Sequence, residues 1–98
     1  MIIQFVLEQL EIPAHPVEKA LHKGDQSKVL IIGFKKGMIL KEHKTHLPAH
    51  LTALTGKVIY HEGESQKVLS QYNETDIPIE MLHSVESLED GLCILCQG

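Results

Sequence analysis

The regular spacing of turn signals constrains the fold of this chain more than any other feature. Short apolar or alternating runs recur at residues 1–10, 17–22, 28–34, 38–43, 51–54, 57–60, 66–69, 76–79, 83–87 and 92–96. Turn-forming segments such as Lys35-Lys36-Gly37 and Thr55-Gly56 separate these runs at intervals of about 8–12 residues. No convincing helix is found, because prolines interrupt the N-terminal third and β-branched residues dominate the rest. The pattern predicts an all-β sandwich or barrel of about nine or ten short strands.

The length of 98 residues allows one hydrophobic core and is too small for two. We find no linker, internal repeat or low-complexity segment. We therefore expect a single domain over residues 1–98, with its core at 17–97 and a separate N-terminal strand at 1–10.

Charge and hydropathy exclude several classes of partner. The net charge of −4 argues against nucleic acid or an anionic membrane surface as a partner. The longest apolar run, at 29–32, is far too short to span a bilayer. The start of the chain has no basic region before its apolar run, so it does not read as a signal peptide. We expect a cytoplasmic protein.

The two cysteines, Cys93 and Cys96, have the spacing of a redox motif. No βαβ pattern accompanies them, as such a motif would require. Strand alternation would send the two thiols to opposite faces of a strand at 92–96. We interpret both as core residues of a buried strand.

Histidine is the unusual residue type in this sequence. There are seven histidines, and His43, His46 and His50 lie within eight residues of one another. His43 follows Gly37 after five intervening residues, and Gly56 closes the same segment. Pro78, His83 and Ser87 form a second group further along the chain.

With these two groups of residues, the segment from Gly37 to Ser87 resembles the two motifs of the cupin superfamily, and in particular the small single-domain bacterial cupins. The resemblance implies a double-stranded β-helix, a jelly-roll-type barrel. It also implies metal-ligand positions at His43 and His83, and a homodimer with the N-terminal strand as a contact element. The chain departs from the motifs in four places: the second histidine of the family falls on Thr45, the glutamate on Ala49, the glycine of the second motif on Glu80, and its asparagine on Ser87.

A histidine directly follows each vacated ligand position, His46 after Thr45 and His50 after Ala49. A bulge between His43 and His46 would rotate both later side chains into the barrel, because one inserted residue moves every following side chain to the other face. We therefore predict a metal site formed by His43, His46, His50 and His83. The alternatives remain open that His43 and His83 line a metal-free pocket, and that His46 and His50 are exposed loop residues.

Four imidazoles suit a divalent transition metal such as zinc, nickel, iron or copper. The sequence contains no recognisable nucleophile with its base. The favoured function is a small barrel protein that binds a metal, a small-molecule ligand or both, without assigned catalysis. The alternative is a metal-dependent enzyme of the oxygenase or isomerase type that acts on a small molecule.

Overall fold

The computed structural model describes residues 2–9 and 16–98, and for His43 the backbone alone. In this part of the chain a single helix precedes nine strands. The elements are α1 (Ile2–Gln9), β1 (Val17–Lys23), β2 (Lys28–Phe34), β3 (Ile39–His43), β4 (Ala49–Thr55), β5 (Val58–Glu62), β6 (Ser65–Leu69), β7 (Glu74–Ile77), β8 (His83–Ser87) and β9 (Gly91–Gln97).

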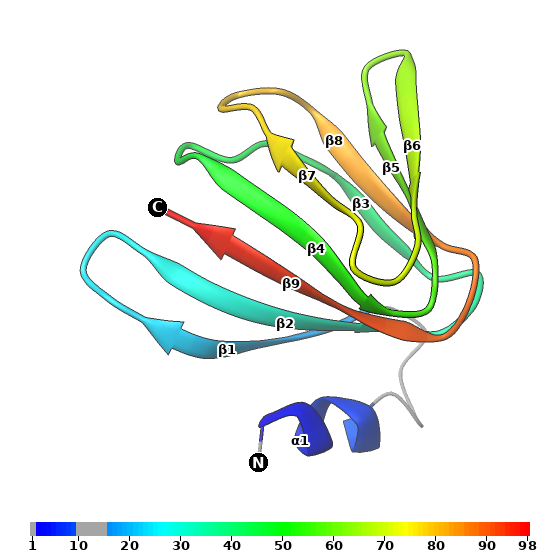
Figure 1. Cartoon of the computed structure of the whole chain (residues 1–98). Helices are drawn as coiled ribbons and strands as arrows, with labels where there is room; N and C mark the ends of the chain where they lie inside the picture. Colours follow the sequence, from blue (N-terminus) through cyan, green and yellow to red (C-terminus); the bar gives the residue numbers. More distant parts are fainter. Residues whose placement is uncertain (1, 10–15) are drawn as a thin grey trace.

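The strands form two antiparallel sheets that face each other (Figure 1). One sheet has five strands in the order β1-β2-β9-β4-β7, and the other has four in the order β3-β8-β5-β6. The predicted all-β barrel is therefore confirmed, and each predicted strand between residues 17 and 97 overlaps an observed one. Local alternation predicts these strands well because one face of each sheet meets the core.

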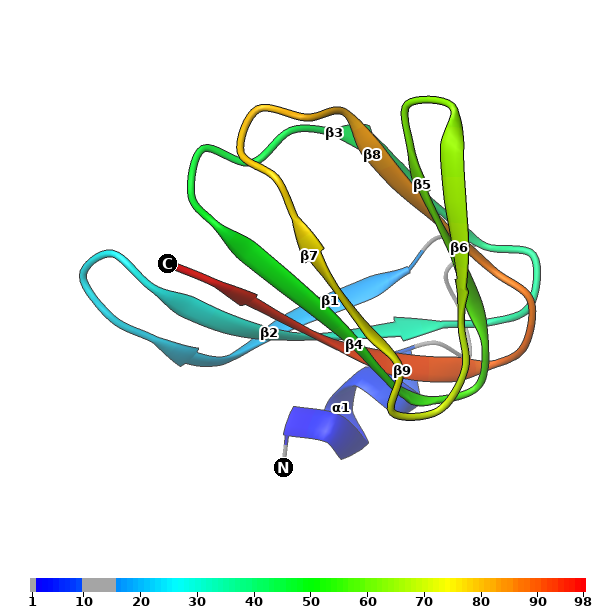
Figure 2. The same cartoon turned by 45° about the horizontal axis from the view of Figure 1, so that its top comes forward.

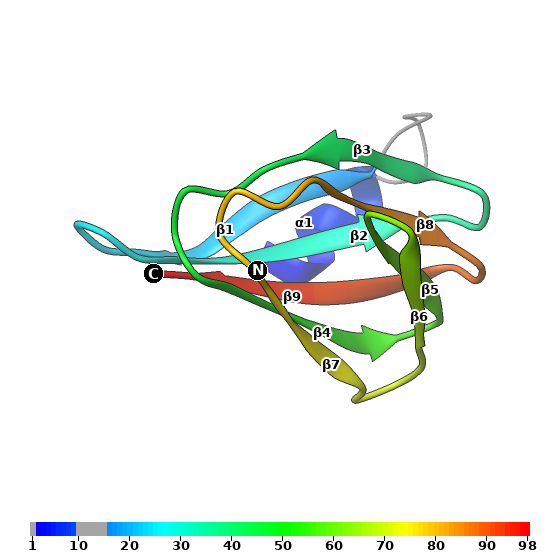
Figure 3. The ribbon, with the colours of Figure 1, turned by 90° about the horizontal axis from the view of Figure 1, so that it is seen from above.

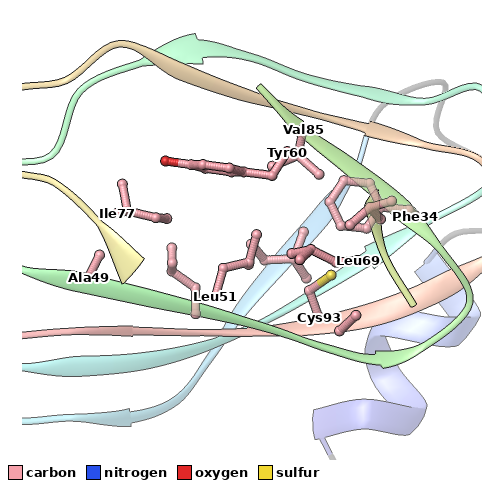
Figure 4. Close-up of a cluster of buried hydrophobic side chains, with 12 residues drawn as sticks. Phe34, Ala49, Leu51, Tyr60, Leu69, Ile77, Val85 and Cys93 are labelled. Carbon is pink, nitrogen blue, oxygen red and sulfur yellow. The ribbon is translucent and has the colours of Figure 1, made fainter. Parts of the chain in front are cut away.

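The core lies between the two sheets. In β4 the buried side chains are Ala49, Leu51 and Ala53, and the residues between them are more exposed. The same alternation in β8 buries every second residue, starting at His83. Figure 4 shows the apolar side chains that fill the interior, with Phe34 at one side of the cluster and Ile77 at the other.

The predicted strand at residues 1–10 is wrong for residues 2–9, which form the helix α1, while Met1 and Leu10 lie outside the described residues. Val6 is fully buried, and Ile2 and Ile3 pack beside it against Ile31 of β2 and Leu92 of β9. Residues three and four apart share one face of a helix, so this packing satisfies a helical period rather than a strand period. The apolar outer face of the five-stranded sheet therefore favours a helix over a strand for residues 2–9.

The interpretation of both cysteines as core residues holds for Cys93 and is wrong for Cys96. Cys93 is buried between the sheets, and Cys96 is exposed. Cys96 lies on the outer face of β9, beyond Leu92 and Ile94, which belong to or pack against the cluster that includes Val6 of α1.

Two tight turns meet at one end of the barrel, which we call the closed end. Gly56, with a φ of 77°, would place an added Cβ 2.4 Å from the carbonyl oxygen of Asp90. Gly91 would place one 2.1 Å from the carbonyl oxygen of Thr55. Because neither position has room for a side chain, glycine at both allows the β4–β5 and β8–β9 turns to pack directly against each other.

The opposite end, which we call the mouth, is where β3, β5, β7 and β9 end and β4, β6 and β8 begin. The loops β3–β4 and β7–β8 lie side by side there (Figures 1 and 2). The β1–β2 hairpin extends beyond the strands next to it at this end, as Figure 3 shows from above. Among the described residues no helix is long and apolar enough to cross a membrane.

Candidate site at the barrel mouth

His83 is the sequence-predicted site residue that the structure places inside the barrel. Its side chain is 3% exposed, and its Nδ1 atom lies 3.1 Å from the carbonyl oxygen of Met81. The ring of Tyr60 packs against the imidazole at a tilt, with the ring centroids 5.9 Å apart. Strand alternation in β8 turns His83 inward together with Val85, which sits deeper in the apolar core.

Tyr60 and Glu62 lie beside this imidazole on β5. The Tyr60 hydroxyl donates a 2.8 Å hydrogen bond to the Glu62 carboxylate, and Glu62 is the cross-strand neighbour of His83. Burial, followed by the contact with Glu62, raises the pKa of the Tyr60 hydroxyl above its usual value. In Figure 4 the hydroxyl end of Tyr60 points away from Phe34, toward the end of the barrel where Ile77 lies.

A further hydrogen bond joins the two sheets beside this group. The Lys67 ammonium on β6 donates a 3.0 Å hydrogen bond to the hydroxyl of Thr75 on β7. Thr75 is buried, and Lys67 is exposed. His83, Tyr60, Glu62, Lys67 and Thr75 thus contribute an imidazole, a phenol, a carboxylate, an ammonium and a hydroxyl to the inner side of the barrel.

The backbone of His43 pairs directly with that of His83 across β3 and β8. The register of these strands shifts between Leu40 and His43, so the irregularity lies before His43. The bulge that the sequence analysis places between His43 and His46 would instead lie after His43. His43 and His83, at the ligand positions that the resemblance implies, are therefore cross-strand neighbours in the backbone.

His46 lies outside the barrel, on the β3–β4 loop. Its side chain is 86% exposed and forms a short hydrogen bond through Nδ1 to the carboxylate of Glu80. Glu80 occupies the position of the motif glycine and has a φ of 62°. The backbone therefore keeps the left-handed conformation for which glycine is favoured, although the residue is a glutamate. The Glu80 N–H also donates to the carbonyl oxygen of Thr45, which ties the two mouth loops together.

His50 lies on the outer face of the five-stranded sheet. Its neighbours along β4, Ala49 and Leu51, are both buried inside, so alternation directs His50 outward. Its Nδ1 atom lies 2.8 Å from Asp76 Oδ1, and its Nε2 atom lies 3.4 Å from Glu74 Oε2. The hydrogen bond to Asp76 raises the pKa of His50 above its ordinary value.

The four predicted metal ligands are therefore not gathered in the described structure. His83 is inside the barrel, whereas His46 and His50 are outside and hold carboxylate partners. Within residues 2–9 and 16–98, the described side chains contain no group of three His, Cys, Asp or Glu residues that could hold a metal ion. The described side chains do not fit a closed four-imidazole site, which would need all four rings to converge.

Sequence reasoning did not single out Tyr60, Glu62 and Lys67 as site residues. Tyr60 is a buried core residue, and its contact with His83 depends on the pairing of β5 with β8. The available signal was the alternation Val58, Tyr60, Glu62, which places a carboxylate on the inner side of a strand. A charged residue on the inner side of a strand is a departure from the alternation of a barrel core.

No protein-family profile matches this chain. No curated protein matches it either. Solved structures do: a cupin superfamily protein from Desulfitobacterium hafniense has a TM-score of 0.80 at 13% identity, covering 85% of this chain and 76% of that one. The fold is that of a cupin.

Two further solved structures agree with this assignment. An RmlC-like cupin protein from Desulfovibrio desulfuricans has a TM-score of 0.78 at 18% identity, covering 86% of this chain and 82% of that one. A cupin 2 conserved barrel domain protein from Leptotrichia buccalis has a TM-score of 0.81 at 25% identity, covering 93% of this chain and 45% of the longer one. Because a fold does not fix a function, the chemistry depends on the residues at the mouth of this barrel.

Proposed function

We propose that this cupin binds a small molecule at the mouth of its barrel, without assigned catalysis. The observation that carries the proposal is the burial of His83 against Tyr60 at the end of a largely apolar core. Burying an imidazole costs free energy unless its polar atoms have partners. Because of this cost, ionisable groups that lie inside a barrel mouth are candidates for a binding site.

The chemistry of the mouth favours a small polar ligand. Tyr60, Glu62 and Lys67 offer a phenol, a carboxylate and an ammonium, each already held by a neighbour. Ile77, on the inner side of β7, supplies an apolar surface at the same end. A ligand with one hydrogen-bonding edge and one apolar face would match this combination, since binding sites commonly combine apolar walls with a few placed polar groups.

Ligand screening by NMR tests this proposal. Compounds that bind the wild-type protein should shift the signals of Tyr60 and His83, and should bind Tyr60→Phe and His83→Gln at least about tenfold more weakly, the effect of losing about 1.4 kcal/mol. His61→Gln is the matched control, because His61 lies on the outer side of the same strand as Tyr60 and interacts with Glu86 there. Binding that is unchanged in the first two variants would place the ligand elsewhere and contradict the proposal.

The proposal extends to a divalent transition metal, with zinc, nickel, iron and copper as the candidates. Its support is the direct backbone pairing of His43 with His83, the two residues at the ligand positions of the cupin motifs. His46 and His50 are left out of this site because both are engaged with carboxylates outside the barrel. The metal-dependent oxygenase or isomerase that the sequence offers as an alternative depends on the same metal.

Thermal melting with each metal distinguishes a site formed by His43 and His83 from a site formed by all four histidines. Metal bound only to the native state should raise Tm, and His83→Ala should remove that shift. His46→Ala and His50→Ala should melt with an unchanged metal-induced shift. If both of these variants lose the shift instead, the four-histidine site predicted from the sequence forms after all. If no metal raises the Tm of the wild-type protein, the metal part of the proposal fails and the organic-ligand site remains.

We also propose that the protein works as a homodimer in the cytoplasm. Phe5 and Leu7, at the two edges of the packed face of α1, remain 43% and 48% exposed, so the N-terminal segment still presents apolar surface. β1 and β3 are edge strands of the described sheets, and an edge strand is a surface on which a second copy can pair. Light scattering at micromolar concentration should return twice the mass of the chain, and cell fractionation tests the location.

A further inference from the structure

A cavity lies against the β1–β2 hairpin, which extends beyond the strands next to it (Figure 3). The described residues that line it are 23–28 of the hairpin and Leu47 of the β3–β4 loop. Its volume is about 160 Å³, below the roughly 300–1,000 Å³ of sites for drug-sized ligands, so it suits a smaller molecule. The group of Tyr60, Glu62 and His83 does not line it, so this cavity is separate from the site proposed above.

The wall of the cavity at Leu47 is fixed by the side chain of Thr45. The Thr45 hydroxyl donates a 2.7 Å hydrogen bond to the Leu47 carbonyl oxygen and accepts one of 3.2 Å from the Leu47 N–H. Thr45 is buried, whereas the Leu47 side chain remains 41% exposed. The residue at the vacated histidine position of the cupin motif therefore holds an apolar side chain where a ligand in the cavity can contact it.

The end of β9 holds the hairpin and the β3–β4 loop together. The Gly98 N–H donates a 2.9 Å hydrogen bond to the Pro48 carbonyl oxygen. A Cβ added at Gly98 would lie 2.6 Å from the Cβ of Ser27, so the chain passes directly against the hairpin. In Figures 1 and 2 the C-terminus lies between the hairpin and the β3–β4 loop. The two walls of the cavity are thus in place before a ligand binds, which lowers the entropic cost of binding.

Two lysines line the cavity from directly opposite positions. The register pairs Lys23 with Lys28 at the end of the β1–β2 ladder. Like charges directly opposite each other destabilise an antiparallel pair. Neither lysine takes part in an ion pair with another described residue, and Lys28 is only partly exposed. The fold therefore places two positive charges beside one cavity without pairing either of them.

We propose that this cavity binds a small monocarboxylate, with its carboxylate between Lys23 and Lys28 and its apolar part against Leu47. An anion between the two ammonium groups replaces their repulsion by two charge-assisted hydrogen bonds. Asp25 supplies a carboxylate to the described lining, so one negative charge on the ligand balances the two lysines and this aspartate. The hydrocarbon stems of the lysines and the Leu47 side chain provide apolar surface for a short chain.

Butanoate, with butan-1-ol as its uncharged match, tests this proposal on the full chain. In NMR titrations butanoate should shift the backbone amide signals of residues 24–28 and 47, and the alcohol at the same concentration should not. Absence of these shifts with butanoate, or equal shifts with the alcohol, would show that the cavity does not recognise a carboxylate. Shifts confined to Tyr60 and His83 would place butanoate at the mouth, which overturns this inference and leaves the proposed function intact.

The role of the two lysines is tested by matched variants. Lys23→Gln and Lys28→Gln should each bind butanoate about three- to tenfold more weakly, the effect of losing one charge-assisted contact near the surface. Lys23→Arg, which keeps the positive charge, should retain the affinity. Lys19→Gln is the control, because Lys19 lies on the same strand but over the ring of Phe5, 5.2 Å from its centroid. Equal weakening in Lys19→Gln and Lys23→Gln would indicate unspecific attraction and contradict the proposal.

Two further variants separate the charge of the ligand from its apolar contact. Asp25→Asn removes a carboxylate from the lining, so it should bind butanoate more tightly than the wild-type protein. Leu47→Ala should weaken the binding of butanoate and leave that of formate, which has no hydrocarbon chain, unchanged. Both residues are exposed, so these substitutions leave the core in place. Weaker binding in Asp25→Asn, or equal losses for both anions in Leu47→Ala, would contradict the assigned position of the ligand.

Discussion

The carboxylate of Glu80 on the β7–β8 loop accepts a hydrogen bond from the imidazole of His46 on the β3–β4 loop. The same two loops are joined by the hydrogen bond from the Glu80 N–H to the Thr45 carbonyl oxygen. His46, predicted from the sequence as a metal ligand, thus stabilises the arrangement of the mouth loops from outside. Glu80 holds this position with a left-handed backbone, although it is not a glycine.

Glycine at position 80 should stabilise the protein relative to glutamine there. A residue with a Cβ in the left-handed region costs about 1–2 kcal/mol, whereas glycine adopts it freely. Losing the exposed pair with His46 should cost both variants about 0–1 kcal/mol. We therefore expect Glu80→Gly to exceed Glu80→Gln in unfolding free energy by about 1 kcal/mol in urea titrations. A Glu80→Gly variant that is the less stable of the two would show that the loop conformation is not strained.

Alanine at Gly56 should be strongly destabilising. The added Cβ would lie 2.4 Å from the Asp90 carbonyl oxygen, at a φ of 77°, so both the contact and the backbone conformation are unfavourable. We expect a loss of at least about 2 kcal/mol by urea unfolding, in the range of overpacking combined with backbone strain. Gly63→Ala is the matched control, because Gly63 has a φ of 58° with nothing within 4 Å of the added Cβ. Equal losses in the two variants would mean that the contact at the closed end contributes nothing.

The stability contributed by His50 should decrease as pH rises. The folded-state pKa of His50 is raised above its unfolded value of about 6.5, mainly by the hydrogen bond to Asp76. The charged pair therefore contributes fully below the unfolded pKa and is lost as pH rises through the folded pKa. Urea midpoints of the wild-type protein and His50→Gln should differ more near about pH 6 than near about pH 9. A difference that grows with pH would contradict the assigned direction.

Truncation of Val6 should destabilise the protein even though α1 is short. Val6 is fully buried against Ile31 and Leu92 on the outer face of the five-stranded sheet. Val6→Ala should lower the unfolding free energy by about 1–2 kcal/mol, the cost of the lost apolar burial and the remaining cavity. Leu7→Ala, at a position that is 48% exposed, should cost clearly less. If Leu7→Ala costs more than Val6→Ala, the helix does not pack as described.

The sequence by itself determined the strands and the two ends of the barrel. The apolar run at Lys28–Phe34 and the segment His83–Ser87 are strands with the predicted bounds. The pattern of side chains in a strand repeats every two residues, so it can be recognised from a few consecutive residues. Gly37 and Gly56 stand at turns with positive φ, as their positions between strands indicate. These features depend on local conformation, which neighbouring residues largely fix.

The tertiary structure decided which side each histidine faces and what the N-terminal segment becomes. The alternation Ala49, His50, Leu51 already favours an outward His50, but the position of the register shift in β3 depends on pairing with β8 and not on any local signal. Residues 2–9 include β-branched residues that suit a strand. A helix is favoured because it packs one apolar face against the apolar outer face of β2 and β9. Burial against distant strands contributes more free energy than the local propensities of a short segment, so these features could not be read from neighbouring residues alone.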